Sequence, residues 1–454
     1  MILLILTMRI ILFLFLLILV PDAIPANAQQ TWSLEDCIAY GMIHNLDIQK
    51  AGLRNQRNEE SYRQSIRNLL PDLSAGTGYG ASFGKSIDPI TNDVVYYSFS
   101  SNSFSASTSV SLFQGFRRIN EIAFAKNLMA AGQYDLQSLK ATLSFRIMDA
   151  YYNVIFFRGI VEISEDLLAA GQWNQDYVEG MIRNGLKAES DILEVAASVA
   201  TEELNKIKAQ NNYEEALLQL KQLINLEEGQ TLVINQVKPD LQMVIKPDQQ
   251  VDSLYYSALS RLPEIQSMRA NVQASKISLA QSNSSYYPSL QFYAGAGSGY
   301  YQTRKDAEGH VIPFINQIAN NASEHLGFSL GIPLLNNGRN RSQTKLARIQ
   351  LKESELSLQQ EQQKLYQKIH QDWKKLLALK MEIDQGTIQV KALEAAEITL
   401  RKKFGKGLAS QFEVSQARNQ LALARSGLLS TSLQYEITSR TIDYYQGIPI
   451  IGMK

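Results

Sequence analysis

The sequence has few of the residues that build disulfide-rich, metal-binding or nucleic-acid-binding proteins. Its 454 residues include a single cysteine, Cys37, so no disulfide can form within the chain. Lys plus Arg and Asp plus Glu both number 44, and this balance gives no net field that would attract nucleic acid. None of the four histidines is spaced as a metal-ligand pair, so we expect no metal site. They are His44, His310, His325 and His370.

Long apolar runs are also absent once the N-terminus is passed. No run of 18 apolar residues follows Val20, which excludes a helical membrane protein but leaves a membrane β-barrel open. At the N-terminus, Arg9 precedes the apolar run Ile10–Val20, and "ANA" follows at Ala26–Ala28. This pattern predicts a signal peptide over 1–28. An uncleaved anchor is the alternative, because the apolar stretch is longer when it is counted from Ile2.

Proline is missing from two long spans, Ile90–Lys238 and Leu334–Ile448. Apolar residues recur there at spacings of three and four, which predicts long amphipathic helices. Each span is broken once by a glycine turn, at "RNGLKAES" (Arg183–Ser190) and at "GKGLAS" (Gly405–Ser410). We therefore expect two long helical hairpins, one over 116–226 with its tip near 185 and one over 340–445 with its tip near 407.

The two halves of the chain repeat one another. "NLDIQ" at Asn45–Gln49 matches "LPEIQ" at Leu262–Gln266 with a shift of 217 residues, whereas "LFQGFRR" at Leu112–Arg118 matches "LLNNGRN" at Leu334–Asn340 with a shift of 222. The difference places a five-residue insertion in an exposed loop of the second half. The predicted units are a first repeat over 29–228, a linker over 229–250, a second repeat over 251–447 and a tail over 448–454.

Between these anchors, each half contains two segments that alternate strictly between apolar and small or polar residues. The pattern predicts strands at about 72–84 and 102–113, and at about 289–301 and 324–334. In the second strand, Phe104, Ala106, Thr108, Val110 and Leu112 form one side. The residues of the other side are Ser103, Ser105, Ser107, Ser109 and Ser111.

Two architectures fit this alternation. A soluble sandwich would bury the apolar side, whereas a membrane barrel would turn it toward lipid and turn the serines toward a wet lumen. The export signal, and rod-like helices that leave no cover for the sheet, favour the barrel. Four strands cannot close a barrel, so other chains must complete it. Two copies give eight strands and a filled interior, whereas three copies give twelve strands and room for water. A channel therefore implies a trimer.

The order of these features resembles that of the TolC family of outer membrane efflux proteins, over essentially the whole mature chain. The resemblance implies a mainly α-helical fold with a membrane β-barrel part: a trimeric 12-strand β-barrel in the outer membrane of a Gram-negative bacterium and an α-helical barrel in the periplasm. Such a trimer is the exit duct for an inner-membrane pump and a periplasmic adaptor, in drug efflux or in type I protein secretion. A periplasmic coiled-coil adaptor or structural protein is the competing class, but it is expected to have one hairpin between compact β domains.

By the same resemblance, the two hairpin tips are the places where the adaptor docks. The second tip keeps the family's Gly-Leu-any-Ser/Thr pattern, whereas the first has Ala188 in place of the hydroxyl residue. In any helical hairpin, these glycines would also cap helices. The predicted docking residues are Gly185, Leu186, Gly407, Leu408 and Ser410.

Acidic residues follow both tips, at Asp191, Glu194 and Glu413. The resemblance places them near the closed end of the tunnel, where carboxylates around a three-fold axis would form a constriction that attracts cations. The alternative is that they are first-turn residues favoured by the helix dipole. Ala409 stands where an arginine can hold the gate closed, so a latch would need other partners such as Lys403 or Lys406.

No catalytic arrangement is visible in the sequence. "GAGSG" at Gly295–Gly299 is similar to a phosphate-binding loop, but it lies within a strand pattern and no GK[ST] follows it. No nucleophile lies beside a base. We therefore expect no enzyme activity and no cofactor.

Overall fold

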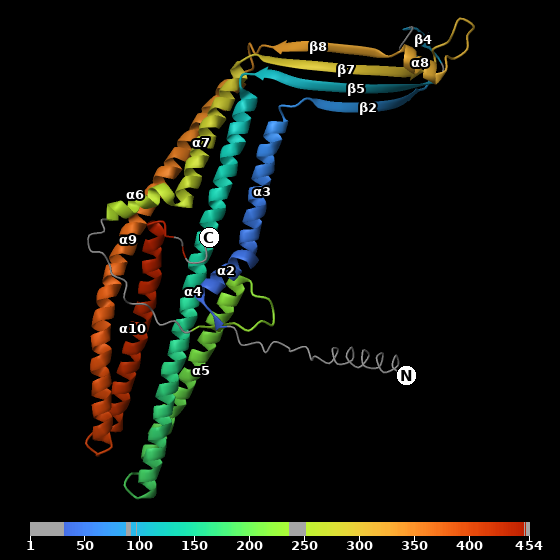
Figure 1. Cartoon of the computed structure of the whole chain (residues 1–454). Coiled ribbons are helices and arrows are strands. Elements are labelled where there is room, and N and C mark those ends of the chain that lie inside the picture. Colours follow the sequence, from blue (N-terminus) through green and yellow to red (C-terminus); the bar gives the residue numbers. More distant parts are fainter. Residues whose placement is uncertain (1–30, 88–91, 97, 236–250, 449, 451–454) are drawn as a thin grey trace, which may run out of the picture.

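The computed structural model describes residues 31–87, 92–96, 98–235, 251–448 and 450, and it shows an elongated molecule (Figure 1). A sheet lies at one end, and two long helical hairpins extend from it to the other end. The predicted signal peptide, residues 236–250 of the predicted linker and most of the predicted tail lie outside the described residues.

Helices form most of the structure, and the second half repeats the arrangement of the first. The longest helix, α4, has 67 residues and is therefore about 100 Å long. The predicted twofold repeat, with two strands and a long helical hairpin in each half, is confirmed. The first half contains α2 (Leu34–His44), α3 (Leu46–Arg67), α4 (Arg117–Arg183) and α5 (Ser190–Ile224). The second contains α6 (Val251–Arg261), α7 (Pro263–Asn283), α9 (Arg339–Phe404) and α10 (Gln411–Tyr445).

The main sheet has four antiparallel strands in the order β2-β5-β7-β8. β8 ends before the predicted residue 334, because Pro333 has no N–H to donate to a ladder. The four strands are β2 (Asp72–Ser82), β5 (Phe99–Gln114), β7 (Ser289–Tyr301) and β8 (Ser323–Gly331). The smaller elements are β1 (Thr31–Trp32), β3 (Ser86–Ile87), β4 (Val94–Val95), β6 (Val233–Ile234), α8 (Phe314–Asn320) and the 3-10 helix η1 (Ser284–Tyr286).

The five-residue insertion lies in the connection between β7 and β8. Residues 302–322 join these strands, whereas residues 83–98 join β2 and β5. The longer connection is five residues longer and holds α8, a helix that the sequence pattern did not predict.

In each half, the start of a shorter helix, α3 or α7, is tied to the end of a hairpin. Asn45, which caps the start of α3, donates from Nδ2 to the carbonyl oxygen of Leu223 near the end of α5, at 3.0 Å. In the second half, Arg261 beside the start of α7 donates from Nη1 to the carbonyl oxygen of Gln446 after α10, at 3.1 Å. In both halves, a side chain before a helix N-terminus satisfies a carbonyl at the end of another helix, which holds the two ends together.

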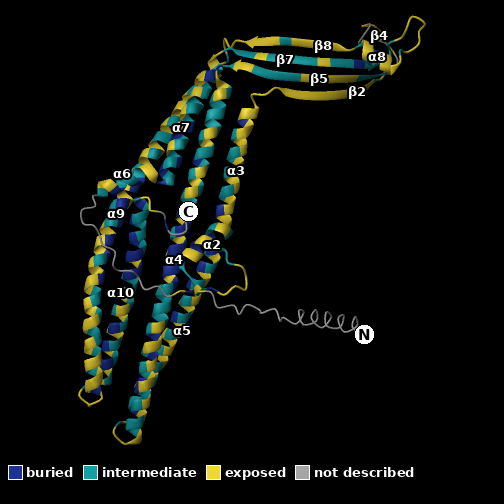
Figure 2. Ribbon diagram, viewed as in Figure 1, coloured by how far each residue is buried: buried dark blue, intermediate teal, exposed yellow. Residues whose placement is uncertain are grey.

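Two hydrophobic cores lie in the middle of the helices: the first is built mainly from the first half, with Leu433 of α10, and the second from the second half. Ile38, Ile147 and Leu220 are buried in the first, and Leu254 and Ile369 in the second. Figure 2 shows that the buried residues gather at this level, while the sheet is largely exposed. Among the described residues, no helix is both long and apolar enough to cross a membrane.

Candidate functional site

The two hairpin tips have the same backbone geometry. Gly185 and Gly407 adopt φ values of +71° and +72°, a left-handed conformation that favours glycine. The next residue bonds back across each turn: Leu186 N–H donates to the Met181 carbonyl, and Leu408 N–H donates to the Lys403 carbonyl, both at 2.9 Å. These are the hydrogen bonds of a glycine cap at a helix C-terminus. The leucines are largely exposed, so each tip presents an apolar side chain to its surroundings.

The second tip starts its next helix with a capping box, and this box includes two predicted site residues. Ser410 Oγ accepts from the Glu413 N–H at 3.2 Å, and the Glu413 carboxylate accepts from the Ser410 N–H at 2.7 Å. The backbone N–H of Ser410 holds the pKa of Glu413 below its ordinary value. Glu413 is therefore charged at neutral pH and has a structural role at the helix start.

The first tip is built differently. Glu189, at the start of α5, makes no capping hydrogen bond with its side chain, and Ala188 has no polar group that could make one. Asp191 instead lies 3.6 Å from Lys187 Nζ. Glu194 is exposed one turn further along the helix. The structure thus places Asp191 and Glu194 in the first two turns of α5, and Glu413 in the first turn of α10.

The sheet has one apolar face and one face of small and polar residues, as the alternation predicts. Across β2, β5 and β7, Ala75, Ala106 and Ala296 are paired, and so are Gly76, Ser105 and Gly297 on the opposite face. We define the apolar face as Leu73, Ala75, Thr77 and Tyr79 of β2, Phe104, Ala106, Thr108 and Val110 of β5, Leu290, Phe292, Ala294 and Ala296 of β7, and Leu326, Phe328 and Leu330 of β8. We define the serine face as Ser74, Gly76 and Gly78, with Ser103, Ser105, Ser107, Ser109 and Ser111, with Gln291, Tyr293, Gly295 and Gly297, and with His325, Gly327 and Ser329.

One residue of the predicted apolar row is displaced. The pairing of β5 with β7 shifts register between Ser111 and Phe113, so that Leu112 is the extra residue of a bulge and Phe113 pairs with Leu290. On the serine face, the strands approach closely: a Cβ added at Gly78 would lie 2.9 Å from Ser103 Oγ. This close approach explains why glycine faces serine there.

The outer edges of the molecule carry exposed apolar side chains. β2 and β8 have a neighbour on one side only within the described residues. The helices that continue these edges, α3 and α9, expose Leu53 and Leu346. Both edges therefore offer unpaired backbone and apolar surface.

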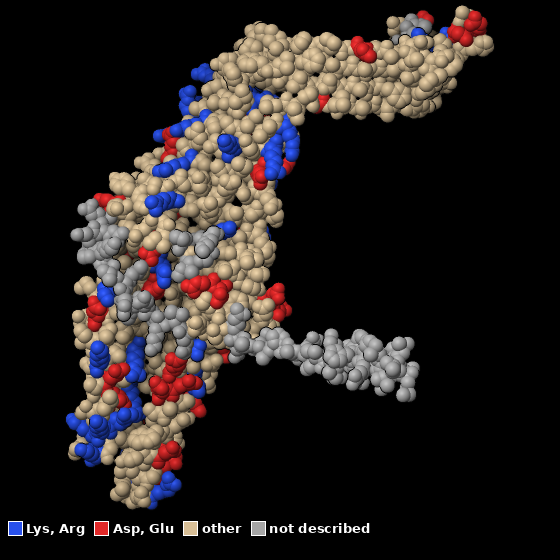
Figure 3. Space-filling view, in the orientation of Figure 1, with Lys and Arg blue, Asp and Glu red and all other residues tan. Residues whose placement is uncertain are grey.

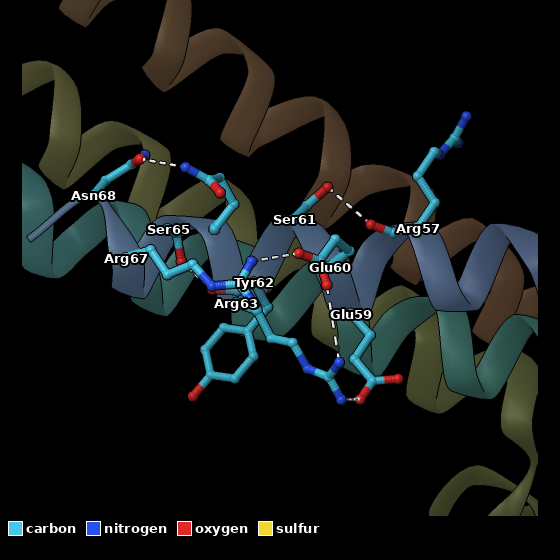
Figure 4. A network of polar contacts seen from close by, with 10 residues as sticks. Arg57, Glu59, Glu60, Ser61, Tyr62, Arg63, Ser65, Arg67 and Asn68 are labelled. Carbon is cyan, nitrogen blue, oxygen red and sulfur yellow. Dashed lines mark hydrogen bonds and ion pairs between the residues drawn. The ribbon is translucent and has the colours of Figure 1, made fainter. Parts of the chain in front are cut away.

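A network of polar contacts lies on α3, and its side chains are exposed (Figure 4). Arg63 Nη2 lies 2.6 Å from Glu59, and Arg67 Nη1 lies 2.5 Å from Glu60, with all four side chains about half exposed. Exposed pairs of this kind contribute only about 0–1 kcal/mol. They form no enclosed site, and we assign them to the solvated surface of an edge helix.

A polar cavity of about 350 Å³ between α4, α7, α9 and α10 was not predicted from the sequence. Asp372 is buried at its wall, where it accepts from Tyr445 Oη and Lys368 Nζ, both at 2.8 Å. Burial raises the pKa of Asp149 and of Glu264, which also line the cavity. These residues come from four helices, so no local motif could have indicated them.

A largely buried arginine that the sequence did not single out joins the two hairpins. Arg418 of α10 lies 3.2 Å from Glu397 of α9, and it donates from Nη1 to the carbonyl of Ala170 on α4, at 3.3 Å. The partners are far apart in the sequence, so the contact depends on the tertiary fold. Among the described residues, no group of three or more His, Cys, Asp or Glu side chains could hold a metal ion.

Comparison with known sequences gives consistent matches along the chain. The family model described as "Outer membrane efflux protein" matches residues 42–226 and 254–447. The chain is 22% identical over 414 residues to the cation efflux system protein CusC of Escherichia coli K12, covering 88% of this chain and 83% of the relative. It is 22% identical over 432 residues to the outer membrane protein TolC of the same strain, covering 92% and 84%. It is 21% identical over 346 residues to the alkaline protease secretion protein AprF of Pseudomonas aeruginosa, covering 74% and 67%.

Solved structures match the fold at low sequence identity. A crystal structure of CusC superposes with a TM-score of 0.77 at 18% identity, over 91% of each chain. The outer membrane protein VceC of Vibrio cholerae superposes with a TM-score of 0.75 at 15% identity, over 91% of this chain and 96% of that one. The shared feature is the whole arrangement of sheet and helices.

Proposed function

Because the chain belongs to the outer membrane efflux protein family, we propose that it is the outer membrane exit duct of a tripartite export machine. It would conduct its cargo passively and carry out no reaction. One observation carries most of this proposal: a sheet with a largely uncovered apolar face and edges unpaired among the described residues stands at the end of two helices about 100 Å long. Such a sheet needs lipid on one face and further strands at its edges.

The strand lengths support a position in the outer membrane. The four strands have 9 to 16 residues, and about 9–11 residues cross a bilayer at a tilt near 45°. Figure 3 shows that charged side chains are spread over the helices but are few on the visible face of the sheet, except at its far end. In this arrangement the apolar face meets lipid, and the serine face lines a wet lumen.

The unpaired edges support a trimer. A head-to-tail contact between β8 of one protomer and β2 of the next generates a ring. Three protomers give a closed barrel of twelve strands, which is wide enough to hold water. The same rotation would bring α3 of one protomer against α9 of the next and cover their exposed leucines.

The hairpin tips are proposed to dock a periplasmic adaptor, which in turn contacts an inner-membrane pump. The support is geometric: two equivalent turns, at the end of the molecule opposite the sheet, each present an exposed leucine. Leu186 and Leu408 would enter apolar grooves of the adaptor's helical hairpin. Gly185, Gly407 and Ser410 would hold the turns in shape.

The acidic residues after the tips are proposed to form the cation-attracting constriction of the trimer. Glu194 is exposed, Glu413 is charged at neutral pH, and Asp191 is partly neutralised by Lys187. Repetition around a three-fold axis would bring nine carboxylates to one end of the tunnel. The test is cation selectivity in planar bilayers after all three residues are replaced by Ala, and unchanged selectivity would contradict the assignment.

The type of cargo is left to the pump in this proposal. The names of the relatives span cation efflux and protease secretion, and a wide duct need not recognise what passes through it. A role in type I protein secretion is therefore the second candidate, and it is supported by the match to AprF. Co-purification with a pump from the native host separates the two roles.

The central test combines fractionation, cross-linking and conductance. The mature chain should be recovered in the outer membrane, cross-link to a trimer and open water-filled pores in planar bilayers. Replacing Leu408 by Asp should abolish export while trimer and conductance persist, because only adaptor contact is lost. Release of the chain by osmotic shock as a soluble protein would instead favour a periplasmic coiled-coil protein.

A further inference from the structure

The connection between β7 and β8 forms an ordered structure at the end of the sheet. It is the longer of the two such connections, and it holds α8 at the end of the sheet away from the helices (Figure 1). The charged residues of the connection, among them Arg304, Asp306 and Glu308, come before α8 in the chain. A short helix that begins with Phe314 and Ile315 therefore follows a charged loop.

Hydrogen bonds to the backbone of β7 fix α8 in place. Gln317 is fully buried; its Oε1 accepts from the Tyr301 N–H at 2.9 Å, and its Nε2 donates to the Tyr301 carbonyl at 3.0 Å. Nε2 also donates to the Ile312 carbonyl at 2.9 Å. One residue past the helix, Asn321 Nδ2 donates to the Gly299 carbonyl at 2.6 Å. These bonds satisfy the end of the strand and define where α8 lies.

The helix covers the apolar face of the sheet and not the serine face. The Phe314 ring lies 5.4 Å from that of Tyr300 and 6.1 Å from that of Phe104. Ser298 Oγ donates to the Ile318 carbonyl at 2.6 Å. Phe104 belongs to the apolar face and pairs directly with Ser298. α8 therefore extends the proposed lipid-facing surface at its outer end.

The outer side of α8 exposes two large apolar side chains, together with the polar Asn316 and Asn320. Ile315 is 71% exposed and Phe314 is 45% exposed, although both follow a helix-start proline in a loop that is otherwise charged. Exposed apolar residues of this size are expected where a helix lies in the plane of a membrane interface. Tyr300 beneath the helix fits the aromatic belt that marks this depth in barrels.

We propose that α8 is an interfacial anchor that inserts Phe314 and Ile315 among the lipid headgroups and upper acyl chains of the outer leaflet. The anchor rests on the proposed function, because it requires the sheet to lie in the outer membrane. Lipid is the occupant that the structure favours, since Phe314 of α8 packs against Tyr300 and Phe104 of the apolar face. Glu324 of the edge strand β8, which pairs with Ala296, places one charge on the same face. The charged loop at 304–310 would mark the water side of the boundary and keep the strands from sinking deeper.

The test uses a fluorescent label on single introduced cysteines in trimers reconstituted into phosphatidylcholine vesicles. The native thiol gives a clean background, because Cys37 is fully buried and burial raises its pKa to about 12. The test site is Ile315→Cys. Ala106→Cys marks the middle of the apolar face, and its neighbour Ser105→Cys marks the serine face. Quenching is compared for iodide on both sides of the bilayer, for lipids brominated near the headgroup and for lipids brominated near the chain end.

The label at position 315 should be quenched more strongly by lipids brominated near the headgroup than by lipids brominated near the chain end. Iodide should quench it at least threefold less than it quenches the label at position 105. Iodide quenching at 315 equal to that at 105, without quenching by either lipid, would overturn the anchor and place α8 in water or against another protein. If the label at 106 also escapes both lipids, the membrane position of the sheet fails, and with it the proposed function. Quenching at 106 but not at 315 rejects the anchor alone.

Discussion

Two arginines of α10 form ion pairs with glutamates of α9, and the two pairs differ in their exposure to solvent. The Arg418 and Glu397 side chains are 14% and 12% exposed, whereas those of Arg425 and Glu394 are 42% and 39% exposed. Removing one partner of a buried pair leaves a charge without compensation and costs about 3–5 kcal/mol, whereas an exposed pair is worth about 0–1 kcal/mol. The more buried contact also reaches α4 through the Ala170 carbonyl.

We therefore predict that Arg418→Met destabilises the helical part by about 3 kcal/mol, and that Arg425→Met, the matched control, destabilises it by less than about 1 kcal/mol. The measurement is the thermal midpoint of the helical circular dichroism signal of detergent-purified protein. Adding Glu397→Gln should recover part of the Arg418→Met loss, because the unpaired charge is removed. Equal shifts for the two arginines would show that burial of the first pair does not matter.

The capping box of Ser410 makes a second prediction at this scale. Ser410→Ala removes the acceptor of the Glu413 N–H and should cost about 1 kcal/mol at the start of α10. Amide hydrogen exchange in the first turn of α10 should become about fivefold faster. Thr399→Ala on α9 is the control, since that hydroxyl donates only to the carbonyl of Ala395 within its own helix.

The stabilisation that the capping box gives to α10 depends on pH. The folded-state pKa of Glu413 is lowered from 4.5, so the stabilisation is present above that value and is lost as the pH falls through the lowered pKa. The exchange difference between the native chain and Ser410→Ala should therefore shrink only at acidic pH. A difference that is already lost at neutral pH would contradict this assignment.

At the scale of elements, the polar cavity between four helices contains a carboxyl group whose charge destabilises the fold, in contrast to that of Glu413. Burial raises the folded-state pKa of Asp149, although the nearby Lys375 opposes the shift. The cost of the charge is absent below the ordinary value of 3.8, grows as the pH rises from that value to the raised pKa, and is constant above it.

Asp149→Asn should therefore raise the thermal midpoint at neutral pH, and the gain should disappear near pH 3.8. Asp166→Asn, at an exposed position of the same helix, should leave the midpoint within the error of the measurement. A lower midpoint for Asp149→Asn at neutral pH would show that the pair with Lys375 outweighs the cost of burial.

The elements themselves were largely predictable, because each is specified by local patterns. Alternation at period two located all four main strands, and the missing prolines with spacings of three and four located the long helices. Two exceptions depended on partners: the bulge at Leu112 depends on the register with β7, and α8 is held by Gln317 through bonds to a strand. The early end of β8 was a local signal, since Pro333 lies inside the predicted strand.

The candidate sites also differ in whether local sequence or distant partners specify them. The tip turns were predictable because a glycine followed by leucine at a helix end is a local signal, and the structure gives both glycines a left-handed backbone. The contacts of Arg418 and Asp372 were not predictable, because their partners on other helices lie 21 to 248 residues away. The role of Glu413 at its own helix start was also within reach of the sequence, because Ser410 and Glu413 have the S-x-x-E spacing of a capping box.

At the scale of the whole molecule, the duplicated halves form a curved unit with two dissimilar edges. In the sheet these edges are β2 and β8, and beside it they are α3 and α9. On α3, the side chains packed toward α4 include Ile48 and Ser65, and Leu53 points away from them with 63% of its surface exposed. In a ring of protomers that leucine would be covered by the next copy.

Leu53→Asp should therefore prevent assembly, since a trimer would bury three uncompensated carboxylates at its interfaces. The matched control is Leu423→Asp, at a comparably exposed leucine on α10, which packs between α4 and α9 and lies on no edge of the unit. Chemical cross-linking and light scattering in mild detergent should show trimers for the native chain and for the control, and monomers with intact helical signal for Leu53→Asp. Trimers for both variants would show that α3 is not part of the ring contact, and dissociation of both would show that the effect is a general loss of stability.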